Sequence, residues 1–319
     1  LHTKRNALIR RELAMQRFIL FRFAQAILAV LVVSIIVFSL SHLSGDPLTT
    51  IMPMGDVEPE DIEALRVKWG LDQPLHIQYG VFLKNAVRGD FGESYAFGGQ
   101  TAMGMVLLRF PATLQLAGAA LVLTILIGLP LGVITAVRKD GFVDYQGKAI
   151  AFLGQAIPNF CLGIGLMWFF AVWLGWLPTS GRGGIDHLIM PAFTLALFQV
   201  AALLRLTRSS MLDVLDTEFI KMARIKGIPE WKVVWKHCLR NAFIAPLTYF
   251  AIIIGSFFTG TVVVETVFSW PGVGQLAVNS VFARDFPTLQ AVVILGSSIY
   301  ITANLLVDIL YAYLDPRIR

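Results

Sequence analysis

Long apolar runs recur along this chain, and they constrain its fold more than any other feature of the sequence. A helix of about 20 apolar residues spans the hydrocarbon core of a bilayer, and it satisfies its own backbone hydrogen bonds there. Of the 319 residues, 56% are hydrophobic and 15% are charged. Such values are foreign to a soluble domain of this length. The sequence therefore predicts an all-α integral membrane protein.

Six segments are apolar and long enough to cross the membrane: 23–43, 112–137, 149–176, 188–206, 242–268 and 288–313. The first has no small-residue cleavage site, which indicates an anchor and not a removed signal peptide. Residues 1–22 before it are polar and basic. Because the chain begins with Leu, we expect Met15 to be the natural start and 1–14 to be a non-native extension.

The distribution of basic residues predicts the orientation of these segments. Lys and Arg gather before the first segment, between the second and third, within 207–241, and at the end of the chain. The short loops on the other side carry only Arg182 and Arg284. Both termini, including 314–319, and the loop 207–241 are thus expected in the cytoplasm. The region 44–111 would then form a periplasmic subdomain beside a core transmembrane domain, 112–313.

The outer region 44–111 is polar and rich in Gly and Pro, which predicts a small, partly helical subdomain. One helix is expected after Pro59 and would contain Ile62 and Leu65. A second apolar stripe predicts another helix, and it consists of Leu75, Tyr79, Phe82, Leu83 and Val87. Acids outnumber bases in this region, which argues against nucleic acid as a partner.

The segment 218–241 is a basic, amphipathic insert between the fourth and fifth apolar segments. At the helical period one arc of 218–228 is apolar, and it holds Phe219, Ile220, Ala223 and Gly227. Pro229 ends this helix, and a second stripe follows at Trp231, Val234, Trp235 and Cys238. The pattern predicts two short helices with an apolar docking face on the first. An amphipathic helix resting on anionic headgroups is the alternative interpretation.

Polar residues within the apolar segments have two interpretations each. Glu265 and Asp308 are the acids nearest the hydrocarbon, and they could couple ion movement or serve as structural anchors near helix ends. Three uncharged residues, Gln155, Asn159 and Gln199, could line a translocation path or hydrogen-bond between helices. Gly128 and Gly132 have the small-xxx-small spacing of closely packed membrane helices.

Motifs of catalysis and of nucleotide or metal binding are absent from the sequence. The stretch 141–149 superficially resembles a phosphate loop, but it has one residue too many and Ala149 replaces the magnesium-binding Ser or Thr. The five His show no metal-ligand spacing, and no nucleophile elbow is present. We expect a non-enzymatic chain without a metal or cofactor of its own. Cys161 and Cys238 fall in different compartments, so no disulfide is expected.

The insert resembles the EAA loop of permease subunits of binding-protein-dependent ABC importers, in the dipeptide, oligopeptide and nickel branch. Its Glu218-Phe219-Ile220 precedes an Ala223-Arg224-Ile225-Lys226-Gly227 core. Lys221 and Met222 stand where the wider family has Glu and Ala. From Met15 onward further stretches are similar to that branch in order and spacing: 71–75, 89–92, 111–114, 262–272, 283–287 and 315–319. The larger outer loop after the first segment is similar to the first of the two permeases.

The resemblance implies six transmembrane helices of the type I importer kind, in a bacterial or archaeal cytoplasmic membrane. A second homologous permease would complete the translocation path. Two ATPase subunits would bind ATP and Mg, and a periplasmic or lipid-anchored binding protein would select the solute. That branch carries dipeptides, longer peptides, glutathione, nickel chelates and oligosaccharides. Two further readings stay open: an ion-coupled secondary transporter that uses Asp308 or Glu265, and an intramembrane enzyme.

The same resemblance assigns the helix to ATPase coupling, with Glu218, Phe219, Ile220, Ala223, Arg224, Gly227 and Ile228 as its residues. Phe219, Ala223 and Gly227 would face the ATPase. Trp231 and Trp235 would pack back on the membrane domain. Under this reading Gly227→Trp would leave the chain folded but block solute-stimulated ATP hydrolysis.

Overall fold

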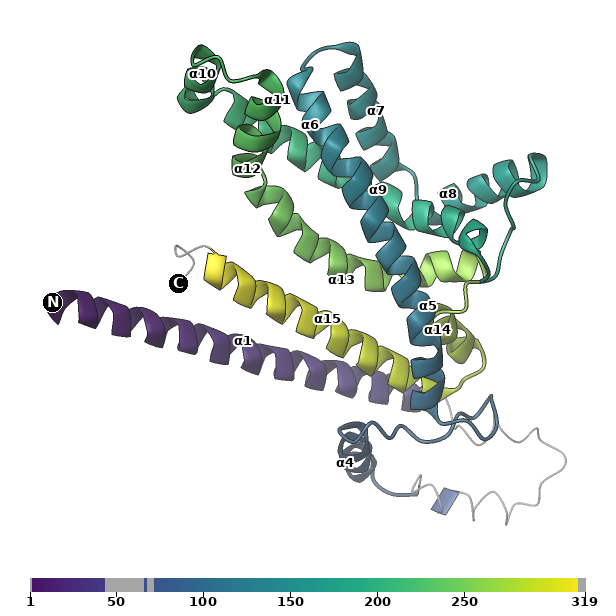
Figure 1. Ribbon diagram of the computed structural model, residues 1–319. Helices are drawn as coiled ribbons and strands as arrows, with labels where there is room; N and C mark the ends of the chain where they lie inside the picture. The colour runs from purple at the N-terminus through teal and green to yellow at the C-terminus, as the bar shows by residue number, and fades with distance from the viewer. Residues whose placement is uncertain (1, 44–65, 68–71, 315–319) are drawn as a thin grey trace. The chain divides into compact units, whose positions relative to one another are not determined.

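The computed structural model describes residues 2–43, 66–67 and 72–314, and these are almost wholly helical (Figure 1). Within these described residues, four helices are long and apolar enough to cross a membrane, or up to six if two bent helix pairs each count as one span. The all-α membrane fold is thereby confirmed. The chain forms two compact units, Leu1–Phe110 with Leu276–Arg319 and Pro111–Gln275.

In the first unit, α1 (His2–Leu43) packs along α15 (Phe286–Leu314). Gln290 Nε2 donates a hydrogen bond to Ser41 Oγ at 3.1 Å between these helices. The predicted outer helix at 75–87 is present as α4 (Leu75–Ala86). Tyr79 and Phe82 of α4 pack on Phe38 of α1, with ring centroids 5.4 and 5.5 Å away. The predicted helix around Ile62 and Leu65 lies outside the described residues.

A buried carboxylate holds the loop that precedes α5 (Ala102–Leu123). Asp285 accepts hydrogen bonds from Ser94 Oγ at 2.5 Å and from the Tyr95 backbone N–H at 3.1 Å. Burial raises the pKa of the Tyr95 phenol to about 12, and the negative charge of Asp285 adds to the effect. The loop 94–95 is thus fastened to the turn before α15.

The second unit is built around α9 (Ile185–Leu215). The long rod of α5, the π-helical η1 (Thr124–Gly128) and α6 (Leu129–Val137) packs along α9. A Cβ placed on Gly132 would lie 2.5 Å from Thr207 Cβ and 2.9 Å from the Leu204 carbonyl oxygen. Only glycine permits this approach, so the small-xxx-small spacing at Gly128 and Gly132 does serve helix packing.

The third predicted span, 149–176, is wrong as a single helix. The chain forms α7 (Phe142–Ala156), then α8 (Asn159–Leu166) with the π-helical η2 (Met167–Trp173), bent by 106°. Pro158 causes the break, since the residue before a proline is disfavoured in the α region. Ile157 accordingly has extended dihedrals, φ −86° and ψ 120°.

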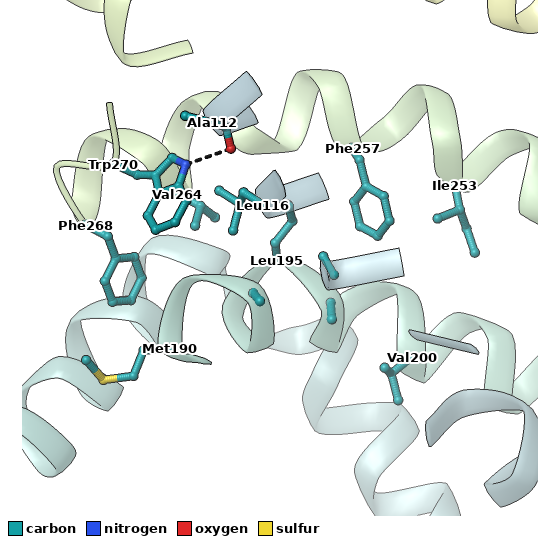
Figure 2. Packing of buried hydrophobic residues seen from close by; sticks show 13 residues of the cluster. Ala112, Leu116, Met190, Leu195, Val200, Ile253, Phe257, Val264, Phe268 and Trp270 are labelled. Carbon is teal, nitrogen blue, oxygen red and sulfur yellow. Dashed lines mark hydrogen bonds between the residues drawn. The ribbon is translucent and has the colours of Figure 1, made fainter. Parts of the chain in front are cut away.

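The fifth and sixth predicted spans correspond to α13 (Ile244–Val267) and α15, while the fourth is longer than predicted, at Ile185–Leu215. A hydrophobic cluster joins α5, α9 and α13, with Leu116, Leu195 and Phe257 among its buried members (Figure 2). Trp270 closes this cluster, and its indole Nε1 donates to the Ala112 carbonyl at 2.9 Å. Packing of α9 against both neighbours makes it the central element of this unit.

Glu265 is fully buried near the end of α13. Its carboxylate accepts hydrogen bonds from Thr113 Oγ1 at 2.7 Å and from the Gln275 backbone N–H at 2.9 Å. The side chain therefore links α13 to α5 and to α14 (Val273–Phe282), which fits the structural interpretation of this acid. The side chain of Asp308 lies outside the described residues.

Candidate functional site

The loop between α9 and α13 forms a helix, a tight turn and a second helix, as the sequence predicts. The first helix, α10, spans Glu218–Ile225 and is three residues shorter than the predicted 218–228. Gly227 ends it with φ +76°. The N–H of Ile228 then bonds to the Ala223 carbonyl at 3.2 Å, and that of Gly227 to the Arg224 carbonyl at 2.9 Å. This is a glycine-dependent helix stop.

The role of Gly227 is therefore to end the helix. A large side chain at this position is a poor test of whether a partner approaches closely. A side chain at a positive φ costs about 1–2 kcal/mol. Gly227→Trp would strain the turn before it touched any partner. A loss of activity in that variant would thus combine two causes, backbone strain in the turn and steric exclusion of the partner.

One side of α10 packs inward on the chain's own helices. Ile220 is 0% exposed and Ala223 is 9% exposed. They belong to a cluster with Val133 and Ala136 of α6 and Met211 of α9. The expectation that Ala223 faces a partner is wrong for this structure, because the small side chain lets α10 approach its own membrane domain.

The outward side of α10 carries a separate apolar group, Phe219, Met222 and Ile225, which we call the outer triad. These side chains are 46%, 51% and 78% exposed, respectively. They follow one another at three-residue intervals, so they lie along one strip of the helix. Exposed apolar groups on a polar, basic loop are typical of a contact surface for another protein.

One ion pair lies within α10, and a second crosses the turn to the next helix. Lys221 Nζ lies 2.8 Å from Glu218 Oε1. Arg224 forms a fork with Glu230 across the turn, with Nη2 to Oε1 at 2.7 Å and Nε to Oε2 at 3.2 Å. Hydrogen bonding to Glu230 raises the pKa of Arg224 above its ordinary value. Exposed pairs contribute little to stability, but a two-point fork fixes the angle between the helices.

The second helix consists of α11 (Glu230–Lys232), the π-helical η3 (Val233–Cys238) and α12 (Leu239–Ala242). Trp231 and Trp235 are 64% and 45% exposed, so the prediction that they pack back on the membrane domain is wrong. Val233, Val234 and Cys238 are buried instead. A π-helical turn pairs residues i and i+5, and it thus places Val233 and Cys238 on one inward face.

The three candidate path residues fall into two groups. Gln155 and Asn159, both half-buried, lie on either side of the bend between α7 and α8. Gln199 is 8% exposed and joins α9 to α13. Its Nε2 donates to Ser256 Oγ at 2.7 Å, and its Oε1 accepts from the Tyr249 hydroxyl at 2.6 Å. Gln199 therefore forms hydrogen bonds between helices, which was the alternative to a place in the translocation path.

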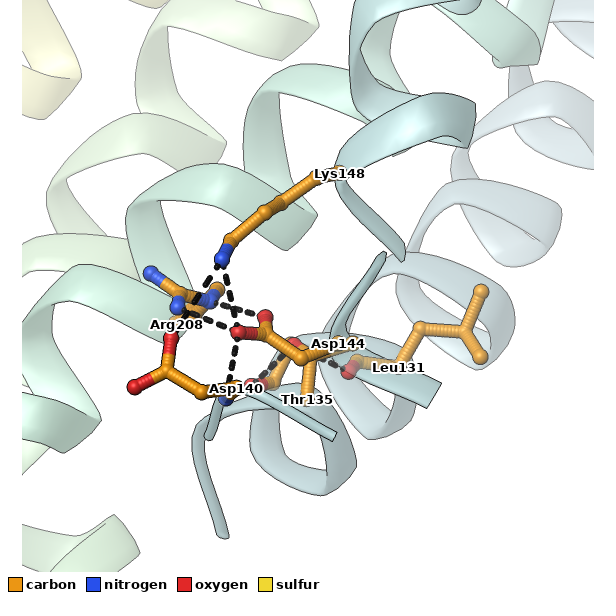
Figure 3. A network of polar contacts seen from close by, with 7 residues as sticks. Leu131, Thr135, Asp140, Asp144, Lys148 and Arg208 are labelled. Carbon is orange, nitrogen blue, oxygen red and sulfur yellow. Dashed lines mark hydrogen bonds and ion pairs between the residues drawn. The ribbon is translucent and has the colours of Figure 1, made fainter. Parts of the chain in front are cut away.

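A buried ionic cluster joins α7 to the last turns of α9, and the sequence analysis did not predict it (Figure 3). Asp144, at the start of α7, is 0% exposed. Arg208 of α9 contacts it through Nε at 2.6 Å and Nη2 at 2.8 Å. Lys148 Nζ lies 2.9 Å from the same carboxylate, and the Asp140 backbone N–H donates to it at 3.0 Å. The sequence signal available was the i, i+4 spacing of Asp144 and Lys148.

Glu230 also went unnoticed in the sequence, because its partner Arg224 lies across a turn where no helical period applies. Among the residues the structure describes, no group of three or more His, Cys, Asp or Glu side chains could hold a metal ion. The site is thus a braced, two-helix protrusion with an apolar outer triad.

Comparison with known proteins matches both parts of the chain to family models. Residues 128–319 match the binding-protein-dependent transport system inner membrane component. Residues 15–117 match the N-terminal model of the same kind of membrane component.

Individual relatives cover nearly the whole chain. The oligopeptide transport system permease protein AppB of Bacillus subtilis is 42% identical, over 86% of this chain and 90% of that protein. The glutathione transport system permease protein GsiC of Salmonella choleraesuis is 40% identical, over 96% of this chain and 99% of that protein. A chain of the inward-facing MetNI methionine ABC transporter has a TM-score of 0.53 at 19% identity, over 66% of this chain and 95% of that chain. That likeness shows the fold, the type I importer permease fold.

Proposed function

The chain belongs to the family of binding-protein-dependent transport system inner membrane components, and from this premise we propose that it forms half of the translocation path of an ATP-driven importer. A second, homologous permease completes the path. Two ATPase subunits bind ATP and Mg in the cytoplasm, and a periplasmic or lipid-anchored binding protein delivers the solute. This chain itself performs no catalysis and holds no cofactor.

The outer triad on α10 carries this proposal. Phe219, Met222 and Ile225 expose apolar surface on the first helix of a loop that is rich in basic residues. The buried side of the same helix anchors it on α6 and α9 through Ile220 and Ala223. A helix held on one side and apolar on the other can transmit a push from a partner into the membrane helices. We therefore assign the outer triad to the ATPase contact and the inner pair to transmission.

The solute we propose is a peptide or a related small molecule. Two relatives support this class, since their names are those of an oligopeptide permease and a glutathione permease. The topology proposed with it places both termini and the loop 207–241 in the cytoplasm and 44–111 outside. Half-buried Gln155 and Asn159 at the bend of α7 and α8 are the path residues that fit this role. The solute contacts in the binding protein decide which peptide is carried.

Ile225→Ser tests the outer triad. Ile225 is 78% exposed, so its removal leaves the fold intact and should change stability by no more than about 0.5 kcal/mol. Loss of an anchor at the centre of an interface costs about 2 kcal/mol or more, which is a roughly 30-fold weaker contact. We expect the ATPase subunits to co-purify poorly with this variant and solute-stimulated ATP hydrolysis to fall accordingly.

Ile185→Ser is the matched control, because Ile185 is 80% exposed but begins α9 at the end away from the loop. Its ATPase co-purification should equal that of the unmodified chain. Equal co-purification of the Ile225→Ser variant would remove the outer triad from the ATPase contact.

The ion-coupled transporter is the second candidate, and one observation weakens it. Glu265 is fully buried and its carboxylate accepts hydrogen bonds from Thr113 and Gln275. Releasing it for ion binding would leave those donors without their acceptor. Glu265→Gln, assayed in vesicles for uptake driven by ATP against uptake driven by an ion gradient, separates the two candidates. Uptake by this chain alone under an ion gradient would favour the transporter.

A further inference from the structure

We propose that the Asp144–Arg208 ion pair is a positioning lock, which makes α7 move with α9 when α10 is displaced and so carries the movement to the bend between α7 and α8. This inference rests on the proposed function and adds a route from the loop to the candidate path residues Gln155 and Asn159. Asp144 lies outside the loop 207–241, whereas Arg208 lies at its start, in the part that α9 still forms.

The contact between α7 and α9 has little else to fix its register. The buried face of α7 consists of Asp144, Gly147, Ala151 and Gly154. A Cβ on Gly154 would lie 2.9 Å from Ala201 Cβ and 3.2 Å from the Leu197 carbonyl oxygen of α9. Small residues bring two helices close. Leu197 and Leu204 of α9 face Gly154 and Gly147, but such apolar contacts carry no directional bond along the helix axis.

The ion pair supplies the directional contact. Arg208 meets the carboxylate with two parallel bonds of 2.6 and 2.8 Å, a geometry that fixes both distance and orientation. Asp144 is 0% and Arg208 19% exposed in their side chains, so water offers little replacement for the pair. A shift of α7 along α9 would break both bonds together.

The same carboxylate also holds the turn between α6 and α7. It accepts the Asp140 backbone N–H at 3.0 Å, and Asp140 itself has a positive φ of 59° in that turn. Arg208, on the other side, belongs to α9, whose end at Leu215 is separated from α10 only by Asp216 and Thr217. One acid therefore ties the α6–α7 turn to the helix that leads directly into the coupling loop (Figure 3).

The C-terminal end of α7 is where the movement carried by the ion pair would have its effect. Movement of α7 reaches the break at Ile157 and Pro158, where the chain turns by 106° into α8. Gln155 and Asn159 flank that break. A rigid link at Asp144 makes the break the place where displacement is absorbed, as hinges commonly are at element ends.

The test uses the whole transporter, with its partner permease and ATPases in lipid nanodiscs. The probe is the binding protein, added once as isolated with its solute and once stripped of solute. The ratio of stimulated to basal ATP hydrolysis is the readout, together with the thermal denaturation midpoint of the complex. Three variants are compared: Asp144→Asn, the double variant Asp144→Asn with Arg208→Gln, and Asp140→Asn as control.

Asp144→Asn leaves the partly buried Arg208 without its counterion, so both the midpoint and the ratio should fall, the ratio by about fivefold or more. The double variant removes both charges of the pair and leaves Lys148, whose side chain is 43% exposed and therefore hydrated. Neutral replacement of a buried pair restores stability. We expect its midpoint to recover while the ratio stays low. Asp140 is 66% exposed and its side chain lies 3.8 Å from Lys148, so Asp140→Asn should keep the ratio.

Recovery of the ratio together with the midpoint in the double variant would overturn the lock, since the pair would then serve stability alone. An unchanged ratio in Asp144→Asn, or an equal fall in Asp140→Asn, would also overturn it. These outcomes leave the proposed function standing. A wild-type chain that binds no ATPase subunits would refute the proposed function and the lock with it.

Discussion

Ile220→Ala should open the inner side of the coupling loop, and the effect can be measured at a single thiol. Ile220 is 0% exposed and shares its cluster with Cys238, which is also 0% exposed. Truncation of a fully buried Ile to Ala costs about 2–5 kcal/mol. Even the lower figure raises the population of the locally opened loop by about 30-fold.

The assay follows maleimide labelling of Cys238 in detergent-solubilised chain. The chain has two Cys, so Cys161→Ser leaves Cys238 as the single thiol. We expect Ile220→Ala to label about 30-fold faster or more, because labelling of a buried thiol requires opening. Ile225→Ala is the matched control, as Ile225 is 78% exposed and its loss should change the rate by no more than about twofold. Equal rates in the two variants would refute the division of α10 into an inner and an outer side.

Two more predictions concern glycines. Gly227→Ala should speed Cys238 labelling by about fivefold or more, since φ is +76° there and an L side chain costs at least about 1 kcal/mol; Gly227→Asn should have a smaller effect, because Asn tolerates this region. Gly132→Ala should lower the thermal denaturation midpoint, since the new Cβ would lie 2.5 Å from Thr207 Cβ, whereas Gly118→Ala, with nothing within 4 Å, should not. A Gly132→Ala chain as stable as the unmodified one would show that α6 and α9 are less closely packed than described.

The sequence predicted the membrane fold, most of the spans and the helix–turn–helix, because each depends on patterns within one segment. Apolar length identified α9, α13 and α15, and Pro229 marked the turn. The bend in the third span was missed although its cause, Pro158, is local. Apolar composition on both sides of a proline outweighed the conformational preference of the residue before it.

The sequence could not predict which face of each loop helix is buried on the chain itself and which is exposed, because an apolar arc does not say which neighbour covers it. Ile220 and Phe219 are adjacent and both apolar, yet one is buried on α6 and α9 and the other is 46% exposed. Trp235 was misassigned because the π-helical turn of η3, in which it lies, changes the period on which the prediction depended. The Asp144–Arg208 pair joins residues 64 positions apart, and no local pattern reports such a contact.

In the proposed function, an ATPase subunit binds the outer triad of α10 while the inner side of this helix packs on its own chain. A photo-crosslinking amino acid placed at position 225, and in a second chain at position 220, tests this in the assembled transporter. The account predicts a covalent adduct between position 225 and an ATPase subunit, and adducts only within the chain from position 220. Failure of position 225 to reach an ATPase subunit, or its labelling by a membrane-impermeant reagent from the outside of intact cells, would contradict it.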